Sequence, residues 1–125
     1  MDLWGGLADR ATGAPWTADS LIVVFSATKG LAAMALNVAA ERGRFVWDRP
    51  VADYWPAFAQ GGKGPITVRQ LFNHRAGLAA LTSPLTLAQL CEPDQADRTR
   101  AILAAQPAAW APDADQGYHA MTFGL

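Results

Sequence analysis

The chain has little cysteine and histidine, no run of like charges and no long apolar segment. Its 125 residues include one cysteine, Cys91, which excludes an internal disulfide, and two histidines, too few to suggest a zinc site. The net charge is −1 without clustered Lys or Arg, so nucleic acid is not an expected ligand. The longest charge-free apolar stretch ends at residue 40 and is too short to cross a bilayer, so we expect no membrane partner.

About half of the residues are apolar, which is enough for the core of one small domain and argues against disorder. The first residues have neither the basic stretch nor the apolar stretch that begins a secretory signal, so the sequence predicts a cytoplasmic protein. The chain ends inside an apolar segment, residues 121–125, with no cap and no polar tail. We therefore expect residues 1–125 to be a domain truncated at its C-terminus.

Local signals place several short elements along the chain, and the helices have the clearer boundaries. Gly43 follows an alanine-rich stretch as a natural left-handed stop, and Thr67 forms a capping box with Gln70. The sequence predicts a strand over 3–7, a strand or extended approach over 21–25, helices over 28–42, 48–54, 67–74, 86–91 and 95–106, a surface loop over 108–116, and an apolar helix or strand from residue 118.

The residues Ser26-Ala27-Thr28-Lys29 follow the apolar run 21–25 and open the alanine-rich helix. A helix start has unpaired N–H groups and a partial positive charge, which stabilise a developing oxyanion. Residues three apart share a helix face, so Lys29 can reach the hydroxyl of Ser26. A lysine among apolar neighbours is poorly solvated, which favours its neutral amine. The spacing therefore predicts a nucleophilic serine beside a general base.

The same four residues admit a structural interpretation, in which Ser26 or Thr28 caps the helix and Lys29 lies on a solvated face. Short motifs of this kind match by chance in many proteins. The neighbours of Lys29 favour the catalytic interpretation, because residues 31–36 carry no charge while a solvated helix face normally carries several.

Further segments of the chain extend this pattern and together resemble a known family. They resemble the class C-type branch of the serine β-lactamase and penicillin-binding-protein superfamily, and most of all its family VIII carboxylesterases. Residues 117–124 are similar to the second motif of that branch, whose tyrosine, here Tyr118, helps to move protons at the serine. The segments are Leu3-Trp4-Gly5-Gly6, Pro15-Trp16-Thr17, Ser26-Ala27-Thr28-Lys29-Gly30-Leu31, Asp48-Arg49-Pro50-Val51, Ile66-Thr67-Val68-Arg69-Gln70-Leu71, His74-Arg75-Ala76-Gly77-Leu78 and Gly117-Tyr118-His119-Ala120-Met121-Thr122-Phe123-Gly124.

The resemblance implies an α+β, β-lactamase/transpeptidase-like fold, of which this chain covers mainly the helical part with short N-terminal strands and lacks the C-terminal sheet strands. It implies catalytic roles for Ser26, Lys29 and Tyr118, meeting in one dry pocket, and no cofactor or metal. The family's third motif, a Lys-Thr-Gly-like strand that supplies one oxyanion N–H, is expected downstream of residue 125. We therefore expect the chain alone to be poorly active and to expose apolar surface.

The activity implied by the resemblance is that of a serine hydrolase cleaving small carboxylic esters through an acyl-enzyme. Class C β-lactamases carry Tyr-x-Asn at the second motif, whereas Ala120 occupies the third position here, so an amide that contacts lactam substrates is missing. The alternatives are a D-alanyl-D-alanine carboxypeptidase or β-lactamase, a non-catalytic penicillin-recognising or peptidoglycan-sensing module, and an unrelated helical interaction domain. The expected partner is a small ester or lactam, and the sequence indicates no oligomeric state.

The other residues with reactive or aromatic side chains have structural interpretations. We expect His74 and Arg75 to form hydrogen bonds at a helix end, His119 to be structural or to line the pocket, Asp48 to cap a helix, and Cys91 to be a small buried residue. The tryptophans are predicted packing anchors: Trp4, Trp16, Trp47, Trp55 and Trp110.

Overall fold

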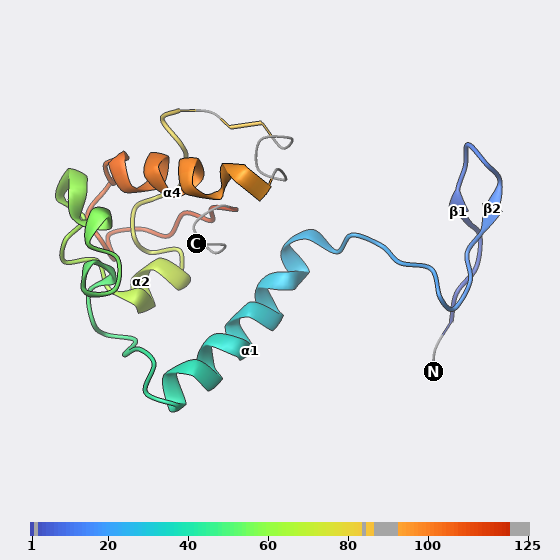
Figure 1. The fold of residues 1–125 in the computed structure, drawn as a ribbon, viewed down its shortest axis with the longest axis horizontal. Coiled ribbons are helices and arrows are strands. Elements are labelled where there is room, and N and C mark those ends of the chain that lie inside the picture. Colours follow the sequence, from blue (N-terminus) through green and yellow to red (C-terminus); the bar gives the residue numbers. More distant parts are fainter. Residues whose placement is uncertain (2, 84, 87–92, 121–125) are drawn as a thin grey trace.

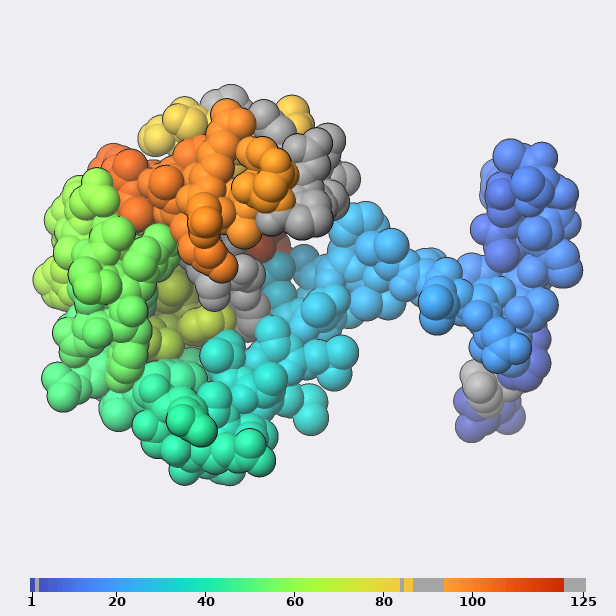
Figure 2. All heavy atoms as spheres, viewed as in Figure 1, coloured from blue at the N-terminus to red at the C-terminus, as the bar shows by residue number. Residues whose placement is uncertain are grey.

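The computed structural model of the chain describes residues 1, 3–83, 85–86 and 93–120. The described residues between 44 and 120 form a lobe that contains helices α2, Val68–Phe72, and α4, Ala96–Ala105. Helix α1, Thr28–Glu41, runs along one side of this lobe, and a β-hairpin lies apart from both at the end of an extended segment (Figure 1). The space-filling view shows the same separation of hairpin and lobe (Figure 2). The described residues also form 3-10 helices at Phe25–Ala27, Val51–Asp53, Pro56–Gly62 and Pro93–Gln95.

The hairpin pairs β1, Leu7–Asp9, with β2, Ala14–Pro15, in antiparallel register. The carboxylate of Asp9 accepts a hydrogen bond from the backbone N–H of Ala11 at 2.8 Å, which closes the turn between the strands. The strand predicted over 3–7 is wrong in position. Pairing begins only at Leu7, because Gly6 directly before it has φ +86° and breaks the extended backbone.

Helix α1 confirms the prediction of a helix that stops at Gly43. The stop residue has φ +69°, and its N–H donates to the carbonyl of Ala40 at 2.9 Å. No residue of α1 is buried. The predicted exposure of apolar surface is also confirmed, since large apolar side chains of α1 and of the segment before it are open to solvent: Leu21, Ile22, Val23, Val24, Phe25, Leu31, Met34 and Val38.

The core of the lobe is a cluster of apolar side chains contributed mainly by residues 51–78: Val51, Phe58, Ile66, Val68, Leu71, Ala76 and Leu78. Trp47 and Trp55 pack against it as predicted, and Trp47 meets the ring of Phe45 edge-on at 4.9 Å between centroids. Trp4 is 53% exposed, so its prediction as a packing anchor is wrong. This tryptophan lies three residues before β1, in the part of the chain that stands apart from the lobe (Figure 1), whereas the core cluster lies within residues 51–78.

Helix α2 begins with the predicted capping box. The Thr67 hydroxyl accepts from the backbone N–H of Gln70 at 3.2 Å, and the Gln70 side chain accepts from the N–H of Thr67 at 2.9 Å. The prediction that Asp48 caps a helix is wrong. Its carboxylate instead binds the Arg69 guanidinium at 2.6 and 3.0 Å, and Pro50 precedes the short 3-10 helix that follows. A bidentate ion pair with a residue of α2 outcompetes the local cap.

Helix α4 confirms the prediction over 95–106, and the exposed loop predicted after it is also present. Residues 118–120 are neither helix nor strand, whereas the rest of the predicted last element, residues 121–125, lies outside the described residues. The predicted helix over 86–91 likewise lies almost entirely outside them, as does Cys91. Among the described residues, no helix combines the length and apolar character needed to cross a bilayer.

Candidate active site

The three side chains predicted to act together meet at one atom, the hydroxyl oxygen of Ser26. The Lys29 ammonium donates to Ser26 Oγ at 3.3 Å, and the Tyr118 phenol donates to the same atom at 2.5 Å. The Lys29 nitrogen lies 5.4 Å from the centre of the Tyr118 ring. A serine oxygen that contacts both an amine and a phenol has two routes by which its proton can leave.

Ser26 and Lys29 owe their proximity to local backbone geometry. Ser26 lies in the 3-10 helix Phe25–Ala27, which leads directly into α1, and Lys29 follows three residues later on the same face. Phe25 has φ +43°, an uncommon value for a residue with a side chain. Such backbone strain often accompanies functional sites, and here it lies directly before the serine.

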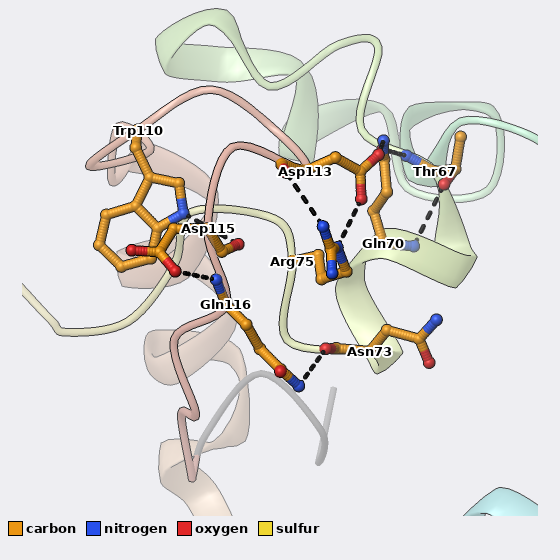
Figure 3. A network of polar contacts seen from close by, with 8 residues as sticks. All are labelled: Thr67, Gln70, Asn73, Arg75, Trp110, Asp113, Asp115 and Gln116. Carbon is orange, nitrogen blue, oxygen red and sulfur yellow. Dashed lines mark hydrogen bonds and ion pairs between the residues drawn. The ribbon is translucent and has the colours of Figure 1, made fainter.

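Tyr118 reaches Ser26 from 92 residues away because the loop before it is fastened to the end of α2 (Figure 3). The Asp113 carboxylate accepts from the Arg75 guanidinium at 2.9 Å and from the Gln70 amide at 2.6 Å. These charge-assisted hydrogen bonds lower the pKa of Asp113, with the bond from Gln70 contributing most. The carboxylate therefore stays ionised and holds the loop against α2.

A second set of hydrogen bonds holds the residues directly before Tyr118 against the end of α2. The Gln116 side chain donates to the carbonyl of Asn73 at 3.2 Å, as Figure 3 shows. The next N–H, that of Gly117, donates to the carbonyl of His74 at 2.9 Å. A Cβ at Gly117 would lie 2.8 Å from the Trp110 ring, so only glycine fits directly before Tyr118.

The electrostatics of the site favour loss of a proton from the phenol. The hydrogen bond to Ser26 lowers the pKa of Tyr118 below its usual value of 10.0, burial opposes this, and the nearby Lys29 lowers it further. A lowered pKa raises the fraction of the phenol that is ionised near neutral pH, and only the phenolate can accept the serine proton.

Two histidines border Tyr118, and no local pattern in the sequence predicts the proximity of His74. The ring of His74 lies 4.7 Å from the ring of Tyr118, and its Nδ1 accepts from the backbone N–H of His119 at 3.3 Å. Burial lowers the pKa of both imidazoles, and the charge of Lys29 adds to this effect. His119 is buried, in agreement with the structural role expected for it.

The three side chains meet as predicted, but the prediction of a dry pocket is wrong for this structure. Tyr118 is 58% exposed, Ser26 is exposed, and Lys29 is half-buried. An apolar cavity lies elsewhere, between α1 and the lobe, and is lined by residues that include Leu36, Phe45 and Trp55. No group of His, Cys, Asp and Glu side chains suited to a metal occurs in the described part of the chain.

The comparisons with known proteins identify the family. A protein-family model described as beta-lactamase matches residues 1–125. The chain belongs to the beta-lactamase family. The esterase/beta-lactamase LipL of Mycobacterium tuberculosis (strain ATCC 25618 / H37Rv) is 42% identical over 124 residues, covering 99% of this chain and 28% of LipL. The resemblance inferred from the sequence motifs is therefore confirmed.

Two solved structures place the chain in the β-lactamase/transpeptidase-like fold. A family VIII carboxylesterase is 42% identical with a TM-score of 0.83, over 96% of this chain and 32% of that one. A penicillin-binding-protein homolog from Caulobacter crescentus is 37% identical with a TM-score of 0.84, over the same shares of 96% and 32%. The chain thus spans about a third or less of the length of these relatives. Its described part is mostly helical with one two-stranded sheet, as predicted for a portion of this fold.

Proposed function

We propose that this beta-lactamase family chain carries the nucleophile of a serine hydrolase that cleaves small carboxylic esters through an acyl-enzyme. The observation that supports the proposal is the double contact at Ser26 Oγ, with Lys29 Nζ at 3.3 Å and the Tyr118 phenol at 2.5 Å. Esterase is also part of the names of two relatives, LipL and EstB of Burkholderia gladioli, the second being 36% identical over 77 residues, 58% of this chain and 20% of EstB.

In the proposed reaction, Ser26 Oγ forms a bond to the ester carbonyl carbon while its proton passes to Lys29 or Tyr118. Both groups donate to Ser26 in their protonated forms, so loss of a proton from either one reverses that hydrogen bond and makes Ser26 the donor. The carbonyl oxygen takes the negative charge at the start of α1, where backbone N–H groups and the helix dipole favour an anion.

The tetrahedral intermediate then collapses and expels the alcohol, which leaves with the proton held by Lys29 or Tyr118. Water attacks the acyl-enzyme, gives up one proton to the same pair of side chains, and releases the carboxylic acid. Ser26 recovers its proton in that step, so the cycle consumes one ester and one water and needs no redox partner.

Ala120 supports esters as the substrate class. An amide nitrogen is a poor leaving group, and its cleavage gains from an added side-chain hydrogen bond that alanine lacks. An alkoxide or phenoxide leaves more easily and depends less on this contact. A fluorescent penicillin that binds without turnover would favour the non-catalytic penicillin-recognising alternative.

The test of the proposal is a substrate comparison on the full-length protein. We expect hydrolysis of short-chain nitrophenyl esters, with kcat/KM at least about 100-fold above that for a chromogenic cephalosporin, a ratio of the size that one substrate contact produces. Accumulation of an acyl-enzyme would appear as a burst of nitrophenol equal to the amount of enzyme. Cephalosporin turnover equal to ester turnover would contradict the assignment of an esterase.

Replacing Tyr118 with phenylalanine tests its share of the proton transfer. If the phenolate accepts the Ser26 proton, kcat/KM rises with pH until the phenol has ionised, which occurs below pH 10.0 because the pKa of Tyr118 is lowered by Ser26 and Lys29. Tyr118→Phe should remove this rise and reduce kcat/KM by about 100-fold.

The matched control for Tyr118 is Tyr54→Phe. Tyr54 is the other tyrosine of the chain, and its hydroxyl accepts from the backbone N–H of Val46 rather than contacting the site. The control should keep both the rate and the pH profile of the unmodified protein. An unchanged profile in Tyr118→Phe would assign the proton transfer to Lys29 alone.

A further inference from the structure

His74 holds the segment that carries Tyr118 at three points. Its carbonyl accepts from the N–H of Gly117 at 2.9 Å, and its Nδ1 accepts from the N–H of His119 at 3.3 Å. The two bonds fasten the backbone on both sides of the tyrosine. Between them, the imidazole lies 4.7 Å from the phenol ring at an interplanar angle of 41°. No other residue of the described chain contacts the tyrosine segment in all three ways.

The backbone of His74 is unusual in a way that serves these contacts. It has φ +58°, in the left-handed region, directly after the end of helix α2. Glycine and asparagine adopt this conformation more easily than histidine, so nothing in the turn itself calls for an imidazole. The imidazole thus occupies a left-handed position that other residues adopt at lower cost, which directs attention to what the ring contacts.

The contact to His119 requires one protonation state of the ring. A nitrogen that accepts from an N–H cannot carry a proton, so Nδ1 must be bare and the ring proton must lie on Nε2. Burial and the charge of Lys29 lower the pKa of His74, which keeps the ring neutral at physiological pH. The groups that face it are Lys29 on α1 and Tyr118 and His119 on the last described segment, while the neighbouring Arg75 is paired with Asp113.

We infer that His74 is a positioning residue for the proton transfer at Ser26, acting through Tyr118 by clamping residues 117–119 with its carbonyl and its neutral imidazole. This inference rests on the proposed function, since it takes the Tyr118 phenol to be a group that transfers a proton at Ser26. Protonated His74 presents an N–H to the N–H of His119 and repels it. The clamp is therefore intact only while His74 is neutral.

Two substitutions separate the ring from the strained turn. His74→Gly keeps the left-handed backbone and removes the side chain, and we expect kcat to fall about 100-fold with KM within about twofold, because the phenol is no longer held in register. Asparagine also adopts this backbone conformation and places an amide oxygen near the position of Nδ1. The kcat of His74→Asn should therefore be at least about tenfold higher than that of His74→Gly. Equal losses in both variants, or none in His74→Gly, would overturn the inference.

The pH profile distinguishes positioning from a general loss of stability. In the unmodified protein the slope of log kcat/KM against pH should steepen from one toward two below the pKa of His74, which lies under 6.5. At such pH a second proton, bound by His74, disables the site in addition to the proton on Tyr118. His74→Asn should keep a slope of one over the same range. A structural role alone would leave the slope alike in both proteins.

A measurement on the protein itself checks the clamp without any activity. The chain has two histidines, so nitrogen-15 NMR of the imidazoles gives two spin systems, which His119→Gln assigns. We expect His74 to be the Nε2–H tautomer with its Nδ1 accepting a hydrogen bond. An Nδ1–H tautomer would refute the clamp. If Ser26→Ala retained activity, the proposed function would fail while the tautomer result stood, so the two failures are distinguishable.

Discussion

Replacing Ser26 with alanine is expected to lower ester hydrolysis by about 10³-fold or more, to the background of the assay. The serine oxygen is the atom on which Lys29 and Tyr118 converge, and neither neighbour can form the acyl bond in its place. The variant should also lose covalent labelling by a fluorophosphonate probe, which mass spectrometry locates at residue 26 in the unmodified protein. Both measurements are made on the full-length protein.

Ser20→Ala is the matched control for this substitution. Ser20 lies in the extended segment before the site, and its hydroxyl accepts from the backbone N–H of Thr17 at 2.9 Å. Its loss should leave the labelling and the rate unchanged, because no contact connects it to Ser26. Labelling that survives in Ser26→Ala would place the nucleophile elsewhere and would refute the proposed acyl-enzyme.

Replacing Lys63 with methionine should produce the largest loss of stability in the lobe. The lysine is 0% exposed, and its ammonium donates to the carbonyls of Gln60 at 2.7 Å, of Ala104 at 2.8 Å and of Gln106. Two of these carbonyls lie at the C-terminal end of α4, where a positive charge also interacts favourably with the partial negative charge of the helix dipole. Methionine fills a similar volume but leaves all three acceptors without this partner.

We expect the free energy of unfolding to fall by about 3 kcal/mol or more in Lys63→Met, since the buried carbonyls of Ala104 and Gln106 lose this donor and an unsatisfied buried carbonyl costs about 1–3 kcal/mol. Urea or thermal unfolding followed by circular dichroism measures the change. The control is Arg98→Met, an exposed cation of α4 whose removal should alter stability by less than about 0.5 kcal/mol. Equal stability of the two variants would show that the buried ammonium contributes nothing net.

The sequence was sufficient wherever the interaction is local. The capping box of Thr67 and Gln70, the alanine-rich helix ending at Gly43 and the approach of Lys29 to Ser26 all depend on residues three or four apart. Helix geometry alone brings such side chains together, whatever the rest of the chain does. Tyr118 was found by its resemblance to a family motif, because no local rule connects it to a serine 92 residues away.

The error at Asp48 and the exposure of the site have their physical origin in long-range contacts. Asp48 looks like a helix cap, yet a guanidinium 21 residues away offers its carboxylate two charged hydrogen bonds instead. No local pattern predicts the burial of Lys63, because its ammonium is buried only by the packing of its segment against α4. The exposure of the three site residues depends on which other segments pack against α1. The hydrophobic periodicity of a helix does not predict these long-range contacts.

The sequence by itself thus determined the family, the helix that presents Ser26 and the lysine one turn above it, because these follow from motif order and from the repeat of the α-helix. Only the tertiary structure decided that His74 clamps the segment of Tyr118 and that Asp113 fastens its loop to α2. These contacts join residues 38 to 45 positions apart, and the free energy that forms them comes from packing the whole lobe rather than from any local preference.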